Sequence, residues 1–235
     1  MLESIIFLLS IIHSIFGMGL LALGTPLLLI LNYDFLTILK ILLPCSIIVS
    51  TFQIIKNKNI LNKDKRLIYI SLPFIFFGAI IVYFYSSQIK FKLVIGFSIL
   101  IIFFLKTILH KKINLIVKKN KRILFSLIGF FHGLTNTGGA LISILFQSLK
   151  RNKFEVRTCI AYTYFFYGLI QYCLLNFFFK EFLLDYNSVK LLIFAVIGYF
   201  FGNKIFKALK YNYFIIILNF IIIISAIYLI FSELK

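Results

Sequence analysis

Long apolar runs separated by short basic connectors organise the chain. Most of the runs reach the roughly 20 apolar residues that a helix needs to cross a bilayer. They cover roughly residues 4–31, 35–55, 67–85, 91–109, 123–149, 154–179, 189–206 and 213–232. This pattern predicts an all-α polytopic membrane protein of about eight hydrophobic segments, folded as a single membrane domain over residues 1–235.

Two of these runs, the first and the fifth, are interrupted by small, helix-breaking residues. The interruptions lie 119 residues apart and read His13-Ser14-Ile15-Phe16-Gly17-Met18-Gly19 and His132-Gly133-Leu134-Thr135-Asn136-Thr137-Gly138-Gly139. Backbone groups freed inside a membrane are tolerated only where protein or a watery cavity satisfies them. Paired interruptions in the two halves of a membrane protein are the sequence feature that points to a transport site.

The order of one broken run and three continuous runs occurs twice, which predicts an internal duplication. Repeat 1 covers about 1–109 and repeat 2 about 123–232. The likeness extends into the next run, because Phe35 and Ile41 match Phe154 and Ile160 at the same offset. We therefore expect two four-segment repeats in which the first segment of each is broken or re-entrant.

Charge indicates how the repeats are oriented. The chain is 62% hydrophobic with a mean hydropathy of +1.05, and it carries 25 Lys and Arg against 7 acidic residues. If every segment crosses the membrane, the Lys and Arg residues divide 15 to 10 between its sides. If segments 1 and 5 are re-entrant, 19 lie on one side and the other holds six: Lys40, Lys90, Lys92, Lys180, Lys190 and Lys235.

The uneven distribution favours the re-entrant arrangement, because cytoplasmic loops carry an excess of Lys and Arg. It predicts two inverted repeats in the plasma membrane, with basic loops in the cytoplasm and both termini outside. The net charge of +18 lies in short connectors between membrane segments, so no nucleic-acid partner is expected.

The interruptions predict a site for an anion. A half-helix starts after each break, near Leu20 and near Gly139, and its first backbone N–H groups have no partner within the helix. Such helix ends carry partial positive charge and bind anions. No Lys, Arg, Asp or Glu lies centrally in any run, whereas a cation carrier would be expected to keep a buried carboxylate. A small anionic substrate is therefore expected.

Several side chains are candidates for binding this substrate. Gly17, Gly19, Gly138 and Gly139 would allow close approach to the backbone, and Asn136 and Thr137 would bind the anion directly. Equivalent positions are held by His13 and His132, which would be either hydrogen-bond donors or proton carriers, or neutral residues that steady the break. Pro44 and Thr163 align at the repeat offset, and each would either contribute to the site or shape its helix.

No catalytic residue, metal ligand or cofactor is expected. Two histidines without cysteine or carboxylate partners are too few for a metal site or a nucleophile–base pair. The chain is therefore not expected to be an enzyme.

In these motifs the chain resembles the TauE/SafE sulfite exporter family. Each half of that family opens with F-G-x-G-G-G and has a proline nine residues after the first glycine. Phe16-Gly17-Met18-Gly19 followed by Pro26 fits this spacing, although Leu20-Leu21 stands where the family has further glycine. The second motif is similar to the other half, with Asn136 in place of a glycine and Leu145 in place of the proline.

The resemblance covers essentially the whole chain and implies a carrier that exports sulfite, sulfonates or related small organic anions. The leading hypothesis is a secondary transporter that works by alternating access between inverted repeats. The alternative is a non-transporting membrane scaffold or assembly factor for a partner complex. The sequence leaves five points open. They are which anion is moved, the direction of transport, the coupling ion, whether the protein is a carrier or a channel, and whether it forms a homo-oligomer.

Overall fold

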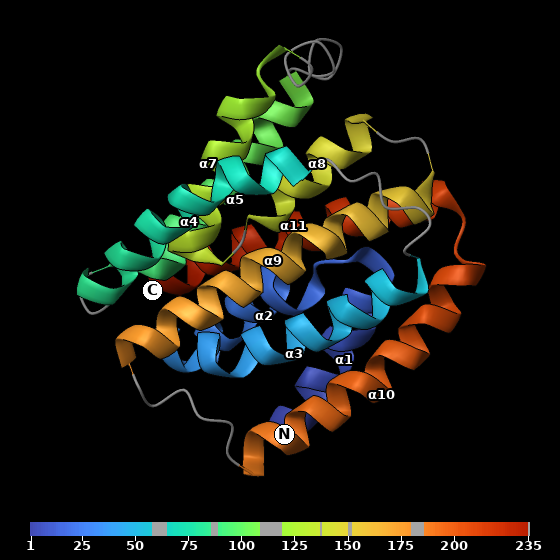
Figure 1. Cartoon of the computed structure of the whole chain (residues 1–235), viewed down its shortest axis with the longest axis horizontal. Helices are drawn as coiled ribbons and strands as arrows, with labels where there is room; N and C mark the ends of the chain where they lie inside the picture. The colour runs from blue at the N-terminus through green and yellow to red at the C-terminus, as the bar shows by residue number, and fades with distance from the viewer. Residues whose placement is uncertain are drawn as a thin grey trace.

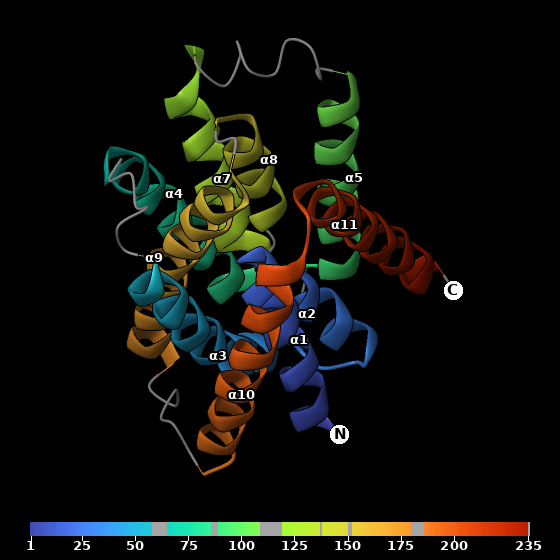
Figure 2. The same cartoon turned by 90° about the vertical axis from the view of Figure 1, so that its right-hand side faces the viewer.

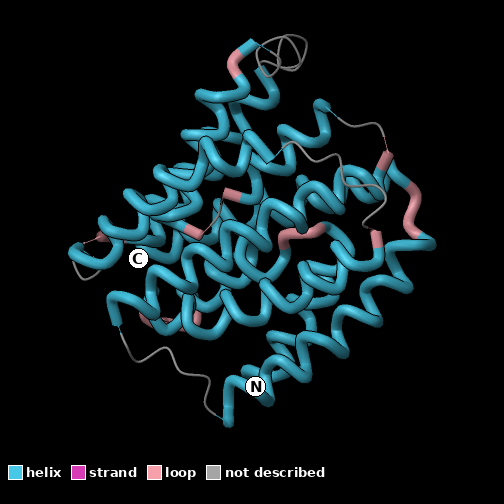
Figure 3. The backbone as a smooth tube through the Cα atoms, in the orientation of Figure 1, coloured by secondary structure: helices cyan, strands magenta, loops and turns pink. Residues whose placement is uncertain are grey.

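The computed structural model describes residues 1–57, 65–85, 89–108, 119–136, 138–149, 152–179 and 186–234. All the regular elements within these ranges are helices (Figures 1 and 3). They are α1 (Leu2–Phe16), α2 (Gly19–Ile30), α3 (Phe35–Lys56), α4 (Lys65–Tyr85), α5 (Phe91–Ile108), α7 (Lys121–Thr135), α8 (Gly139–Leu149), α9 (Lys153–Phe179), α10 (Tyr186–Ala208) and α11 (Tyr211–Leu234).

The helices have the length and composition of membrane spans. Among the described residues, α3, α4, α9 and α10 each contain a stretch that is long and apolar enough to cross a bilayer. These stretches are Phe35–Lys56, Ile68–Tyr85, Lys153–Phe178 and Ser188–Ala208, and α1 and α2 are shorter apolar helices. The chain is a multi-pass, all-helical membrane protein.

Both interruptions end a helix with the same backbone geometry. Gly17 follows α1 with φ 83°, and Asn136 follows α7 with φ 61°, which places both in the left-handed region. The Gly17 N–H donates to His13 O over 2.6 Å, and the Asn136 N–H donates to His132 O over 2.8 Å. Helices commonly end with such a left-handed residue, usually glycine and sometimes asparagine. The two caps are separated by the repeat offset of 119 residues.

After the first break the chain folds back on itself. A Cβ atom at Gly19 would lie 2.4 Å from His13 N, and one at Gly24 would lie 3.0 Å from Leu9 Cδ1. Later residues of α2 thus face earlier residues of α1, so the two helices run antiparallel as a hairpin. The contact at Gly19 leaves no room for a side chain, which explains why glycine begins α2.

Glycines let the broken helices pack closely on their neighbours. Gly198 and Gly202 of α10 lie against α1, and Gly129 and Gly133 of α7 lie against α4. A Cβ atom at any of them would lie 2.3–2.6 Å from a backbone oxygen. Small residues at helix interfaces are typical of membrane proteins because they let backbones approach. The other main pairings join α3 to α9 and α5 to α11 (Figure 2).

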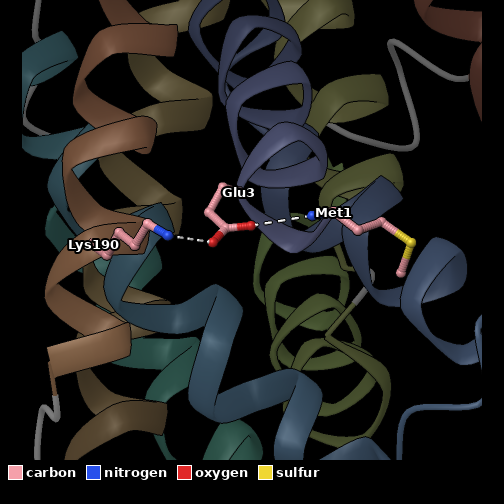
Figure 4. A network of polar contacts seen from close by, with 3 residues as sticks. All are labelled: Met1, Glu3 and Lys190. Atoms are coloured by element: carbon pink, nitrogen blue, oxygen red, sulfur yellow. Dashed lines mark hydrogen bonds and ion pairs between the residues drawn. The ribbon is translucent and has the colours of Figure 1, made fainter.

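An ion pair joins the start of α1 to the start of α10 (Figure 4). Lys190 Nζ donates to a carboxylate oxygen of Glu3 over 2.7 Å, and the N-terminal ammonium donates to the other oxygen over 3.3 Å. The hydrogen bond from Lys190 is the main cause that lowers the pKa of the Glu3 carboxyl to about 2. Glu3 therefore stays charged to well below neutral pH.

Candidate functional site

Both ring nitrogens of His13 form hydrogen bonds at the first break. Its ring is completely buried, and the Leu20 N–H, in the first turn of α2, donates to Nδ1 over 3.2 Å. Because Nδ1 accepts this bond, the proton of the neutral ring is on Nε2, which donates to Ser50 Oγ of α3 over 3.0 Å. His13 is thus a neutral residue that caps α2 and uses one of the N–H groups that sequence analysis assigned to an anion.

The end of α1 is held by side chains from two other helices. Gln53 of α3 donates through Nε2 to His13 O over 3.1 Å and to Ser14 O over 2.9 Å. Arg157 of α9 donates through Nη1 to the same Ser14 O over 3.2 Å. The left-handed Gly17 lies against the backbone of Arg157, where a Cβ atom would be 2.8 Å from the carbonyl oxygen. These donors satisfy carbonyls that the broken helix leaves without partners.

His132, the equivalent residue of the second break, has a different hydrogen-bonding environment. Its side chain is also completely buried, but neither Nδ1 nor Nε2 has a hydrogen-bond partner among the described residues. Its ring contacts two tyrosines of α9, with centroids 5.4 Å from Tyr164 and 5.0 Å from Tyr167. Neither phenol oxygen has a partner at hydrogen-bond geometry in the described part of the chain. The Tyr164 oxygen lies beside the Gly139 backbone and the Tyr167 oxygen beside the Ser71 side chain.

Tyr164 covers the start of α8. A Cβ atom at Gly139 would lie only 1.6 Å from Tyr164 Oη, so the phenol reaches the first backbone of the helix because position 139 has no side chain. In the first repeat, the imidazole of His13 occupies the corresponding place at Leu20. The hydroxyl of Tyr167 faces Ser71 of α4. Two phenols and one imidazole therefore gather at the start of α8.

Asn136 links the second break to α2. Its amide Nδ2 donates to Thr25 Oγ1 of α2 over 3.1 Å, while its Oδ1 has no partner among the described residues. At the next described position, a Cβ atom on Gly138 would lie 2.7 Å from His132 Cβ. The second break thus meets α2 of the first hairpin among buried residues, and Gly138 keeps the backbone close to His132.

The chemistry available at the start of α8 is that of neutral hydrogen-bond donors. The helix end supplies backbone N–H groups and partial positive charge. His132, Tyr164 and Tyr167 supply ring N–H and phenol O–H groups. Among the residues that the structure describes, no group of three or more His, Cys, Asp or Glu side chains could hold a metal ion. Such an arrangement suits a small anion better than a cation.

The remaining predicted residues have separate surroundings. Thr163 Oγ1 donates to Cys159 O over 2.9 Å, so its hydroxyl is used inside α9. Pro44 is partly buried in α3, about 9 Å along the helix from Ser50 at 1.5 Å per residue. Thr137 lies outside the described residues.

Sequence analysis missed four residues that the structure places at or beside the breaks: Tyr164, Tyr167, Ser50 and Arg157. The tyrosines are three residues apart on one face of α9, but Tyr and Phe are so frequent in this chain that the spacing carried no signal. Arg157 was counted with the connector charges, yet it is only 1% exposed. The expectation that charged residues stay in the connectors is wrong at this position, because the Arg157 side chain reaches Ser14 of α1 and Asn203 and Phe206 of α10.

The discontinuous helices, the apolar spans and the buried donors define a helical membrane transporter. Residues 4–229 match the family model of the sulfite exporter TauE/SafE, and the chain belongs to this family. The family implies transport of sulfite or related anions across a membrane, and its members are transporters, not enzymes. No curated protein and no solved structure was found to match the chain.

Proposed function

We propose that this protein is a plasma-membrane secondary transporter of a small anion, sulfite or a sulfonate, and that the anion binds at the start of α8. The observation that carries the proposal is the set of buried groups there without a protein partner among the described residues, on His132, Tyr164 and Tyr167. Buried polar groups in proteins are nearly always paired. An anion that accepts from several of them would complete the site.

Neutral donors can hold an anion in this position. Each hydrogen bond strengthens where water is excluded, and the end of α8 adds the field of its backbone dipoles. Gly138 and Gly139 let His132 and Tyr164 lie against the backbone at the start of α8, and Asn136 contributes the second N–H of its amide. Thr137 precedes α8 in sequence, and we assign it a hydroxyl contact with the same anion.

The mechanism that we propose is alternating access between two inverted repeats, about 1–109 and 123–232. Two observations support the duplication. The left-handed caps Gly17 and Asn136 lie at the repeat offset, and the pairing of α1 with α10 is matched by the pairing of α7 with α4. The distribution of Lys and Arg supports basic loops in the cytoplasm and both termini outside. Inverted repeats with broken helices at their interface are a common transporter architecture.

The two breaks have different roles in this proposal. His13, Gly17 and Gly19 hold the first hairpin, because both nitrogens of His13 are used within the protein. His132 is the residue that binds the anion. The substrate site therefore lies mainly in the second repeat.

The experiment is to measure the thermal stability of the purified protein in detergent against sulfite, sulfate, thiosulfate, taurine, sulfoacetate and chloride. An anion that binds only the folded state stabilises it by about 2.7 kcal/mol at a hundredfold excess over its Kd. We expect a selective rise in Tm with one anion, which is lost in His132→Ala and kept in the control Tyr213→Phe, on the exposed face of α11.

Two results would count against the proposal. A shift of the same size in His132→Ala would place the anion elsewhere. No shift with any anion would favour the alternative of a scaffold or assembly factor, which predicts co-purification with a partner complex.

A further inference from the structure

One face of α9 carries a stripe of buried polar side chains. Successive members of this stripe are seven, three and four residues apart, a spacing that places them on the same side of a helix. They are Arg157, Tyr164, Tyr167 and Gln171. Each is at most 1% exposed, and each has a polar atom without a partner among the described residues. The stripe spans about 21 Å along α9 at 1.5 Å per residue, which is about two-thirds of a membrane core of about 30 Å.

Helix packing alone does not require this polarity. The residues of α3 that lie 119 positions before the stripe residues are apolar or weakly polar. They are Ile38, Cys45, Ile48 and Phe52. Helix α3 packs against α9 in the centre of the fold (Figure 1). An apolar stripe would therefore serve an equivalent position, and unpaired buried polar groups cost stability. Helix α3 carries its own buried polar residues, Ser46, Ser50 and Gln53, at other positions. The polar side chains of α9 at positions where α3 has none point to a role in binding.

Arg157, at one end of the stripe, carries a buried charge without an acidic partner in its hydrogen bonds. Nη1 donates to Ser14 O over 3.2 Å and to Asn203 Oδ1 over 3.3 Å, and both acceptors are neutral. The guanidinium lies 3.7 Å from the centroid of the Phe206 ring. Its Nε has no partner among the described residues. A buried cation that lacks a counter-charge is costly, so an anion at Nε would be stabilising.

Further cations surround this end of the stripe. Lys56 ends α3, Lys153 begins α9 and Lys207 lies in the last turn of α10, and these helix ends gather at the right of Figure 1. Like-charge repulsion acts between Lys56 and both Lys207 and Arg157, and between Lys153 and Arg157. Lys153 is tied to α10 by hydrogen bonds to Phe206 O and to the carbonyls that follow. Clustered charge of one sign raises the local concentration of the opposite ion.

Resting on the proposed function, we propose that Arg157 forms a second binding site for a small oxyanion. The buried apolar side chains Ile160 and Ala161 separate it from the site at the start of α8. The two positions are about 10 Å apart along α9, from Arg157 to Tyr164. A planar guanidinium suits an oxygen ligand of sulfite or a sulfonate group. Gln171 would contact the anion on the opposite side of the central site.

The experiment is calorimetric titration of sodium sulfite into the full-length protein in nanodiscs of phosphatidylcholine, a zwitterionic lipid, so that no anionic headgroup competes. We expect two binding events for the unaltered protein. Arg157→Gln should remove one event and His132→Ala the other. Lys204→Gln, which removes an exposed charge near the end of α10, is the matched control and should keep both events.

A structural role for Arg157 would give a different result, because losing its bonds to α1 and α10 would lower Tm without anion and weaken both events together. The double variant Lys56→Gln/Lys207→Gln avoids the core and should weaken only the Arg157 event, severalfold at low salt. A single event that Arg157→Gln leaves unchanged, or equal affinities in the double variant, would overturn the second site and leave the proposed function standing. The absence of any sulfite binding would overturn both.

Discussion

The ring of Tyr164 stands edge-on to the ring of His132, with centroids 5.4 Å apart and planes at 85°. The same phenol ring also stands edge-on to His13, with centroids 6.0 Å apart and planes at 89°. One side chain of α9 thus contacts the histidines of both breaks. His13 is fully hydrogen-bonded within the protein, whereas the ring nitrogens of His132 have no partner among the described residues.

The two histidines should respond oppositely to substitution. His132→Ala should abolish sulfite transport in reconstituted vesicles while membrane insertion stays intact, because the ring has no protein hydrogen bond to lose among the described residues. His13→Ala should lower the free energy of unfolding by about 1–3 kcal/mol, since it leaves the Leu20 N–H and Ser50 without their partner. Flux and Tm of both variants, measured side by side, test this. Wild-type flux from His132→Ala would contradict the assignment.

Removal of a single phenol oxygen should weaken anion binding without lowering the stability of the fold. In Tyr167→Phe the ring stays against His132, and the hydroxyl that is lost faces Ser71 without hydrogen-bond geometry to a described residue. We expect about tenfold weaker sulfite binding, the effect of losing about 1.4 kcal/mol of hydrogen bonding. The Tm without anion should not fall. Tyr213→Phe, at an exposed position, serves as the control, and equal affinities in the two variants would exclude Tyr167 from the site.

The second break should depend on the left-handed conformation of Asn136. Asn136→Ala keeps a side chain at φ 61° without the local hydrogen bonding that favours asparagine there, which costs roughly 1–2 kcal/mol. It also removes the bond to Thr25. Asn136→Gly removes the same bond but fits the backbone. Thermal unfolding should therefore rank the wild type above Asn136→Gly and Asn136→Gly above Asn136→Ala. An equal Tm for Gly and Ala would contradict the backbone argument.

The interface of α4 with α7 should not tolerate a methyl group. In Gly133→Ala the new Cβ would lie 2.3 Å from Ile75 O, so the helices must separate, at a cost of about 1–3 kcal/mol. Gly168→Ala is the matched control, because its Cβ first meets a side-chain atom of Ile47 at 3.3 Å. The control should change stability by no more than about 1 kcal/mol. Similar losses of Tm in both variants would mean that the α4–α7 contact is less close than the structure has it.

Acid should release the contact between the start of α1 and the start of α10. The pKa of Glu3 is lowered from its ordinary value to about 2, so the stabilisation is present above the unfolded pKa of about 4.3 and is lost as pH falls toward 2. The Tm of Glu3→Gln should lie slightly below that of the wild type at pH 7, and the gap should close as the pH falls below about 4. A gap of undiminished size at pH 2 would point to a cause other than the ion pair with Lys190.

Much of the architecture could be predicted from hydrophobic length and from the breaks. The helices follow the apolar runs because a backbone in lipid must satisfy its own hydrogen bonds. The first apolar run divides into α1 and α2 at Gly17, where a left-handed residue ends α1. The fifth divides at Asn136 for the same reason. The prediction of site residues had a limit, because helical spacing and repeat alignment do not indicate which atoms already have partners. This applies to Thr137, Pro44 and Thr163.

The sequence by itself determined a helical membrane protein with two broken segments and the family to which it belongs, because length, periodicity and glycine conformation are local properties of the chain. Only the tertiary structure decided that His13 is hydrogen-bonded to Leu20 and Ser50, that His132 faces two tyrosines, and that Arg157 is buried. Those facts depend on contacts between residues up to about 140 positions apart. The hydrogen bond that a side chain makes, and hence what it can offer a substrate, is fixed by its neighbours in space.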